Sequence, residues 1–397
     1  MNGDSTPAYR IDRKLILIIL VTIVLFTGGC WDRREMETLG IVAGVGLDWV
    51  GKEKKFVLTA QVIKPTQVQT PHGGGGGGGE GEEAVWVVKS KAETVFKGVR
   101  GFLFESSRRL YFPHNQIIVV GKDAAREGVG PLLDFFTRDA EPRLSEWFLV
   151  AEGEAAEVLQ AKAGLEKIPA LAISRLLNNY TGTSEIGRSN LLGFLTRLLS
   201  KTTAPYAPLI KVEGEGAELK YRISGTAVFR KDKYIGELNK RETRGLLWLL
   251  GEVQDGIVTM DYGGGKVDVE LIKSACRIRP EMKDGSIRMQ VEIRAEGNLG
   301  ANLAPVDFSV TERTRDLNSK LATAIKGEVE ASLEKARTLQ ADLFAFGEAV
   351  QRKYPKEWRE LEKKWMEIFP QLEVEIDVRT NLRLLGLTTR PTIIKEE

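Results

Sequence analysis

The sequence predicts an α+β fold of two to three mixed α/β domains, with a long amphipathic helix near the C-terminus. Two patterns follow one another along the chain: short apolar or alternating runs, typical of strands, and apolar residues three or four positions apart, typical of helices. The chain has 397 residues, of which 42% are hydrophobic and 28% are charged. At about 150 residues for each domain, this length allows two or three separate cores.

The N-terminal half alternates strands with helices, which favours an α+β or α/β domain. We expect strands at residues 40–48, 55–64, 84–89, 116–120 and 147–151, and helices at residues 92–104, 130–137 and 154–163.

A Gly-rich segment, residues 65–83, separates the second expected strand from the third. It contains seven consecutive glycines, Gly73 to Gly79. A phosphate-binding loop requires a Lys-Ser or Lys-Thr pair at fixed spacing and the start of a helix, and neither follows these glycines. We therefore expect a mobile loop and no nucleotide site here.

Pro205, Pro208 and the stretch Gly214–Gly216 indicate a domain boundary. The predicted domains are an N-terminal α+β domain, residues 30–208, and a C-terminal α+β domain, residues 216–397, with a division of the latter into two subdomains near residue 265 left open. In the C-terminal half we expect strands at residues 221–230, 233–237, 257–262, 266–279 and 287–296, and helices at residues 240–250 and 311–353.

Residues 1–29 have the three parts of an export signal. Basic residues precede a run of twelve mostly apolar residues, Leu15–Phe26, and the small residues Thr27–Gly29 then lead to Cys30. A helix of that length rises about 18 Å, whereas the hydrocarbon core of a bilayer is about 30 Å thick. Export followed by cleavage fits this pattern better than a stable membrane span.

The two glycines before Cys30 resemble the bacterial lipobox, in which the cysteine thiol receives diacylglycerol and the peptide is cut just before the cysteine. Cys30 is therefore the predicted lipidation site, an N-palmitoyl, S-diacylglycerol cysteine at the start of the mature chain. Thr27 stands where a lipobox usually has leucine. The alternative is an uncleaved anchor, because the uncharged stretch Leu15–Trp31 has 17 residues. In either case the basic residues before the apolar run favour export of the rest of the chain.

Composition leaves little room for catalysis. The chain has two cysteines, Cys30 and Cys276, and two histidines, His72 and His114, so a disulfide framework is excluded and a zinc site would need most of the available ligands. His114 has no Cys, His or paired carboxylate at ligand spacing, which favours a structural role, and Cys276 in an expected strand favours a small buried side chain. We expect no catalytic residue, no cofactor and no metal site. The net charge of +2 gives no general attraction to nucleic acid.

The segment 356–369 places Trp358, Leu361, Trp365 and Ile368 on one face of a helix. An apolar helical face of this kind can bind a membrane surface. The polar face carries as many acidic as basic residues, however, which favours packing in the core or against a partner subunit.

Several sequence blocks together resemble the C-subunits of spore germinant receptors, the Ger(x)C lipoproteins. The resemblance covers essentially the whole mature chain, with the blocks in the same order and at similar spacing. The blocks are Cys30–Glu35, Gly44–Asp48, Leu110–His114 with Gln116, Leu133–Asp139, Asp342–Glu348, Tyr354–Trp358 and Asn381–Gly386.

The resemblance implies a three-domain α+β protein, lipid-anchored at the outer face of the spore inner membrane. It also implies two polytopic membrane subunits, of the A and B type, as partners in a nutrient germinant receptor complex, and a C-subunit with no catalytic residues. The alternative function is that of a lipid-anchored extracytoplasmic solute-binding protein. An extracellular enzyme is the third class, and it lacks a recognisable nucleophile–base pair.

Overall fold

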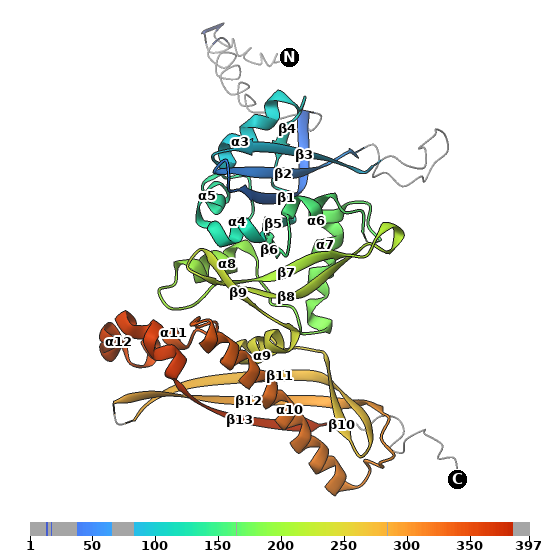
Figure 1. Cartoon of the computed structure of the whole chain (residues 1–397), viewed down its shortest axis with the longest axis vertical. Coiled ribbons are helices and arrows are strands. Elements are labelled where there is room, and N and C mark those ends of the chain that lie inside the picture. The colour runs from blue at the N-terminus through green and yellow to red at the C-terminus, as the bar shows by residue number, and fades with distance from the viewer. Residues whose placement is uncertain are drawn as a thin grey trace, which may run out of the picture.

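The computed structural model describes residues 38–65, 83–163, 165–283 and 285–383, together with Arg13, Lys14 and Leu17. These residues form two β-sheets with helices packed on them (Figure 1). The predicted lipidation site, Cys30, and the glycine run within the segment 65–83 lie outside the described residues. The predicted α+β fold class is confirmed.

The first sheet has nine strands in the order β3-β2-β1-β5-β6-β7-β8-β9, with β4 paired to the start of β1. At its centre β1, β5, β6 and β7 run parallel, and the strands on either side pair antiparallel. The strands are β1 (Leu39–Val50), β2 (Lys55–Ile63), β3 (Val85–Ala92), β4 (Arg109–Tyr111), β5 (Ile117–Gly121), β6 (Trp147–Ala151), β7 (Tyr206–Glu213), β8 (Lys220–Arg230) and β9 (Lys233–Leu238).

Helices cover both faces of this sheet. On one face α3, α4, α5 and α8 enclose one core, and on the other face α6 and α7 enclose a second. Every position of β5 and β6 is therefore buried, which explains why these strands are continuous apolar runs. The elements are α3 (Val95–Gly101), η2 (Phe102–Phe104), α4 (Lys122–Glu127), α5 (Gly130–Arg138), α6 (Ala155–Gln160), α7 (Pro169–Asn178), η3 (Asn179–Gly182) and α8 (Leu191–Leu199).

The second sheet has four strands in the order β10-β11-β12-β13. Burial alternates along β11 and β12, because the helices pack on one face only and the other face is exposed. The elements are η4 (Gly216–Glu218), α9 (Lys240–Leu250), β10 (Ile257–Tyr262), β11 (Gly265–Lys283), β12 (Ser286–Asn302), α10 (Thr311–Thr338), α11 (Phe346–Lys353), α12 (Pro355–Ile368), η5 (Phe369–Gln371) and β13 (Glu373–Leu382).

The two sheets pack against each other through a common hydrophobic core. Helices α9, α11 and α12 lie between them in Figure 1, and the core of the second sheet also includes Tyr206, Val228 and Leu238 of β7, β8 and β9. Because β7 pairs with β8 up to Glu213, the first sheet continues into residues 209–215, the expected boundary between two domains. The division into domains 30–208 and 216–397 stays a prediction.

The helix expected over residues 311–353 is wrong in one respect: it is two helices. Helix α10 ends at Thr338, the chain turns, and α11 begins at Phe346. Gln340 and Ala345 have positive φ angles of 49° and 57°, which no helix continues through. The apolar spacing hid this break because Leu343, within the turn, is buried like the helical positions on either side.

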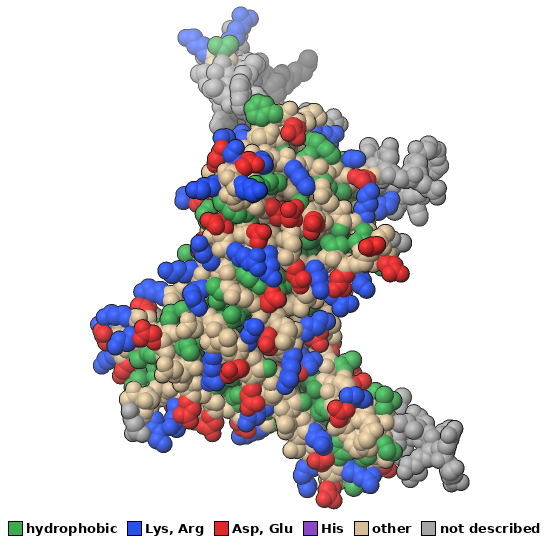
Figure 2. All heavy atoms as spheres, viewed as in Figure 1, with side chains coloured by type: hydrophobic (Ala, Val, Ile, Leu, Met, Phe, Trp, Pro, Cys, Tyr) green, Lys and Arg blue, Asp and Glu red, His purple; other side chains and the backbone are tan. Residues whose placement is uncertain are grey.

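Lys, Arg, Asp and Glu side chains are interspersed over the face that Figure 2 shows. This distribution agrees with the small net charge of the chain, +2. Among the described residues, no helix combines the length and the apolar character needed to cross a bilayer.

Candidate functional site

The block Gly44–Asp48 is a packing and capping motif in β1. A side chain at Gly44 would place its Cβ 2.8 Å from the Cβ of Ala170, so only glycine allows α7 to pack this closely on the strand. Asp48 accepts hydrogen bonds from the backbone N–H groups of Ala155 (2.7 Å) and Ala156 (3.0 Å), which caps α6. Burial raises the pKa of Asp48, and the two N–H donors oppose that change.

A cleft of about 800 Å³ opens beside Asp48, where the parallel strands β1, β5 and β6 reach their carboxyl ends. Open α/β sheets bind small ligands at this edge. Its charged lining is mixed, with basic residues from β3 and α4 and acidic residues from β1, α4, α6 and the segment after β6. These residues are Asp48, Lys89, Lys91, Lys122, Asp123, Arg126, Glu152, Glu154 and Glu157. Lys91, Lys122 and Arg126 already pair with Glu53, Glu237 and Asp123, so a polar solute in this cleft would compete with these ion pairs.

The opposite edge of the same strands holds a buried amide and carboxyl pair. Asn115 and Glu146 are 4% and 3% exposed, and the side-chain amide of Asn115 donates to the Glu146 carboxyl. The backbone N–H of Arg143 donates to the other carboxyl oxygen at 2.9 Å. Burial nevertheless raises the pKa of Glu146 to about 7. His114 lines a hollow of about 280 Å³ beside this pair.

The block Asp342–Glu348 forms the turn that separates α10 from α11. Asp342 is 2% exposed and its carboxylate accepts hydrogen bonds from the backbone N–H groups of Phe344, Phe346 and Gly347 and from the indole N–H of Trp365. Four donors satisfy the buried carboxyl, although burial still raises the pKa of Asp342.

This turn also joins the two halves of the molecule. The backbone N–H of Ala204 donates to the carbonyl of Asp342, and Arg197 in α8 donates to the carbonyl of Leu343 at 3.0 Å. The hydroxyl of Thr203 donates to Glu348 at 2.7 Å. The block therefore holds the segment before β7 against α11.

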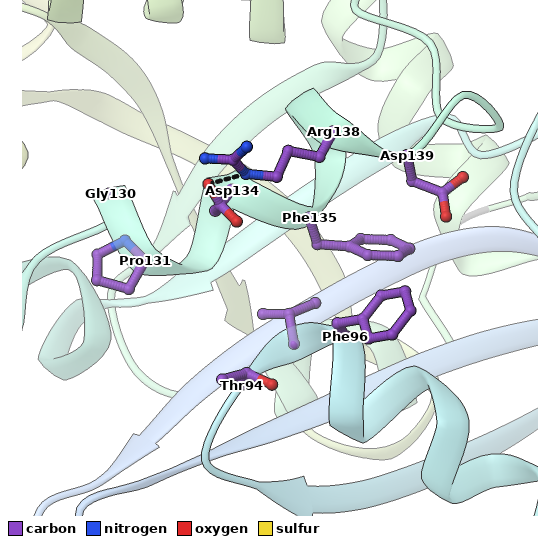
Figure 3. A pocket seen from close by; sticks show the side chains of 9 residues that line it. Thr94, Phe96, Gly130, Pro131, Asp134, Phe135, Arg138 and Asp139 are labelled. Atoms are coloured by element: carbon purple, nitrogen blue, oxygen red, sulfur yellow. Dashed lines mark hydrogen bonds and ion pairs between the residues drawn. The ribbon is translucent and has the colours of Figure 1, made fainter.

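The block Leu133–Asp139 lies in and after α5, and it lines an open pocket of about 650 Å³ against α3 (Figure 3). Leu133 and Phe136 point into the core, whereas Asp134, Phe135 and Arg138 line the pocket. Arg138 donates to Asp134 at 2.7 Å.

The floor of this pocket is aromatic. The rings of Phe96 and Phe135 lie 6.3 Å apart, and Phe96 is 52% exposed. Thr94 stands at the start of α3, where its hydroxyl accepts from the backbone N–H of Lys97 at 3.2 Å. Such a pocket can take an apolar side chain and a charged neighbour from a partner protein.

Three further residues named from the sequence, Cys276, Trp358 and Trp365, are buried or half-buried. Cys276 is a half-buried free thiol, and burial raises its pKa to about 12, so it is not a reactive thiolate. Trp358 and Trp365 of α12 are 4% and 1% exposed and contact each other in the core, which confirms the packing interpretation of this helix. Within the described ranges, no three His, Cys, Asp or Glu residues could hold a metal ion.

Sequence reasoning missed the roles of Glu146 and Asp342. Asp342 stands in an otherwise apolar stretch with Leu343 and Phe344, and a lone acid among apolar residues signals a buried, hydrogen-bonded carboxyl. Glu146 directly precedes the buried strand β6, which is the corresponding signal.

Two family models match consecutive parts of the chain. "Spore germination protein N-terminal domain" matches residues 32–212, and "Spore germination B3/ GerAC like, C-terminal" matches residues 224–386. Together they span almost the whole of the described body.

Curated relatives match over nearly their full length. Spore germination protein KC of Bacillus subtilis (strain 168) is 27% identical, over 96% of this chain and 98% of that protein. Spore germination protein YndF of the same organism is 29% identical, over 95% and 98%, and spore germination protein B3 is 22% identical, over 91% and 95%.

The crystal structure of the GerBC protein has the same fold, with a TM-score of 0.54 and 20% identity over 85% of this chain and 96% of that one. The family models, the relatives and this fold agree with the sequence blocks described above. The chain therefore belongs to the Ger(x)C family of spore germination proteins.

Proposed function

We propose that this chain is the lipid-anchored, non-catalytic subunit of a nutrient germinant receptor complex in spore germination. The observation that carries the proposal is the match to both family models in order, over residues 32–212 and 224–386. In this proposal the chain lies at the outer face of the spore inner membrane and binds two polytopic subunits, of the A and B type. The names of its relatives, among them spore germination proteins A3 and B3, support this role.

The proposed anchor is Cys30, acylated on its thiol and on its amino group. Two or three acyl chains on one residue hold a protein at a bilayer almost permanently, because each buried CH₂ contributes about 0.8 kcal/mol. The first residue matched by the N-terminal family model is 32, which supports an N-terminal segment, here proposed to be an export signal, outside the part shared by the family.

The non-catalytic part of the proposal is supported by how the buried acids are used. Asp48 and Asp342 are each committed to backbone N–H groups, at a helix start and in a turn. A carboxyl held in this way is committed to positioning the backbone.

The anchor is tested by the Cys30→Ala variant, expressed in a spore-forming host with labelled palmitate. We expect the precursor to stay uncleaved and unlabelled, and we expect spores that depend on it to lose their nutrient response. Cys276→Ala is the matched control, because it removes the other cysteine and leaves labelling intact. Full labelling of Cys30→Ala would refute the anchor.

The complex is tested by affinity purification of the acylated chain from spore membranes in mild detergent. The proposal expects two polytopic subunits to co-purify in fixed proportion. A chain that is labelled with palmitate but purifies alone would remove the receptor part of the proposal and keep the anchor.

Solute binding is the second candidate function, and the cleft of about 800 Å³ at the ends of β1, β5 and β6 favours it. Volumes of this size accommodate small ligands. A saturable rise of the melting temperature with one amino acid or sugar, lost in Lys89→Met, would support this function. If no nutrient shifts the melting temperature, solute binding is rejected and the receptor role is the one candidate function that remains.

A further inference from the structure

The N-terminal end of the described body carries an exposed apolar tip, which we define as residues 102–109. Within η2, Phe102 is 1% exposed and is held in the core. The next two residues turn outward: Leu103 is 48% exposed and Phe104 is 94% exposed. An almost fully exposed phenylalanine next to an exposed leucine costs solvation free energy unless something covers it.

The tip lies where the chain leaves for the proposed anchor. Leu39 and Gly40 at the start of β1 pair with Arg109 and Leu110 of β4. A Cβ at Gly40 would lie 3.7 Å from the Cβ of Arg108. In Figure 1 α3 and β4 lie together at the top end of the molecule, and Figure 2 shows hydrophobic side chains on that end.

The segment that joins the proposed anchor, Cys30, to the start of β1 at Leu39 is short, and we call it the tether. Leu39 is nine residues after Cys30, and a fully extended chain spans at most about 3.6 Å for each residue, so the tether reaches about 32 Å at most. A body held by this tether therefore keeps the start of β1, and the tip beside it, close to the headgroups of the bilayer.

The charge of the tip fits an anionic surface. Two arginines, Arg108 and Arg109, and one acid, Glu105, lie within the tip, and a third arginine, Arg100, stands two residues before it. All three arginines are exposed. Arg109 contacts Glu141 at 3.4 Å and Arg100 lies over the ring of Phe96, whereas Arg108 stands four residues after Phe104 and is exposed.

We propose that the tip docks on the membrane as a second contact, with Phe104 and Leu103 in the interfacial layer and Arg108 against anionic headgroups. The inference rests on the proposed acylation of Cys30, which supplies the tether. Apolar insertion together with basic residues at the headgroups is the usual combination for interfacial binding. Docking at two points fixes the orientation of the body, with β1 and β4 toward the bilayer and the four-stranded sheet away from it.

The test makes the tether independent of acylation. The chain from residue 30 onward, with Cys30→Ser and Cys276→Ser, is held by an N-terminal histidine tag on nickel-chelating vesicles that contain phosphatidylglycerol. An environment-sensitive fluorophore is attached at Phe104→Cys. Leu199→Cys is the matched control, because Leu199 is 83% exposed and lies at the end of α8, away from the tip.

We expect the emission at position 104 to shift to the blue and to lose about half its intensity with nitroxide-labelled lipid, and the emission at position 199 to do neither. Adding Arg108→Glu should lower the fraction of docked molecules about fivefold in phosphatidylglycerol vesicles and leave it unchanged in neutral ones. Equal emission at 104 and 199 would overturn the inference and leave the tip as a protein contact. Palmitate labelling of Cys30 is measured separately, so a failed anchor and a failed docking surface give different results.

Discussion

The two sheets of this protein differ in how many of their faces are covered by helices. The nine-stranded sheet has helices on both faces, so β5 and β6 are buried at every residue. The four-stranded sheet has helices on one face, so β13 alternates between exposed and less exposed residues over most of its length. The comparison teaches that a continuous apolar run marks a two-sided strand and an alternating run marks a one-sided strand, within one chain.

The difference also determines where contact surfaces arise. Close packing on both faces of the first sheet leaves its functional candidates at strand ends and between helices, as in the cleft beside Asp48 and the pocket of α3 and α5. The free face of the second sheet is charged and carries ion pairs such as Arg288 with Glu373 and Arg379 with Asp377. The two larger pockets described above, of about 650 and 800 Å³, therefore both lie in the N-terminal part.

The largest loss of stability is expected in the turn between α10 and α11, which joins the two halves of the molecule and which we call the joint. Asp342→Ala removes the acceptor for three backbone N–H groups and for the indole of Trp365, and should lower the free energy of unfolding by about 5 kcal/mol. Urea denaturation measures it. The control is Asp377→Ala on the free face of the second sheet, 52% exposed, which should cost less than about 1 kcal/mol. Equal effects would show that the joint contributes no more than the surface.

The two kinds of strand can be compared directly by truncating one leucine and one isoleucine. Leu149 in β6 is 0% exposed, and Leu149→Ala should cost about 4 kcal/mol through lost burial and the cavity left behind. Ile272 in β11 is 47% exposed, and Ile272→Ala should cost about 0.5 kcal/mol. Thermal and urea unfolding of both variants measure this. Similar losses would contradict the distinction between two-sided and one-sided strands.

The buried carboxyl of Glu146 makes the first sheet sensitive to pH. Its pKa is raised from 4.5 to about 7 in the folded protein. The folded state therefore holds a proton that the unfolded state has released between these values, so this group lowers stability as pH rises from about 4.5 to 7. The loss is at most about 3 kcal/mol.

Glu146→Gln should remove this dependence, because the amide does not titrate. The measurement is the free energy of unfolding of both proteins at pH 5 and pH 8. A wild-type protein that gains stability across this interval relative to the variant would contradict the raised pKa.

The smallest loss of stability is expected from a substitution at Gly44, compared with a control substitution at Gly300. Gly44→Ala should cost about 2 kcal/mol, because its Cβ would meet the Cβ of Ala170 at 2.8 Å between β1 and α7. Gly300→Ala in β12 is the control, since its nearest neighbour would lie at 3.6 Å, in ordinary contact. Their difference, read from urea midpoints, measures how much tighter the two-sided sheet is packed. A destabilised Gly300→Ala with an unaffected Gly44→Ala would reverse the comparison.

Most strands and helices were predictable because each carries its own local signal, but β4 and β7 were not among the expected strands. The expected helix 240–250 and the expected strands 147–151 and 257–262 coincide with α9, β6 and β10. Helix α9 is marked by a capping box of Asn239 and Glu242 and by Gly251 in the left-handed conformation at its end.

The helices α4, α7 and α8 were not predicted from the sequence. Helix α4 has only six residues, Lys122–Glu127, which is too short to show a period. Helices α7 and α8 are longer but stand in a stretch where Pro169 and Asn190 at their starts were not recognised as signals. The break after α10 was hidden for the opposite reason, since apolar spacing continued across it.

The sequence by itself determined the fold class, the family and the location of the expected lipidation site, because these depend on local periodicity and on short blocks of adjacent residues. Tertiary structure decided what the blocks do: Asp48 caps a helix that begins at Ala155, and Asp342 binds Trp365 while its turn contacts the segment before β7. Contacts between residues so far apart in the chain are set by how the sheets and helices pack. No local pattern encodes that packing.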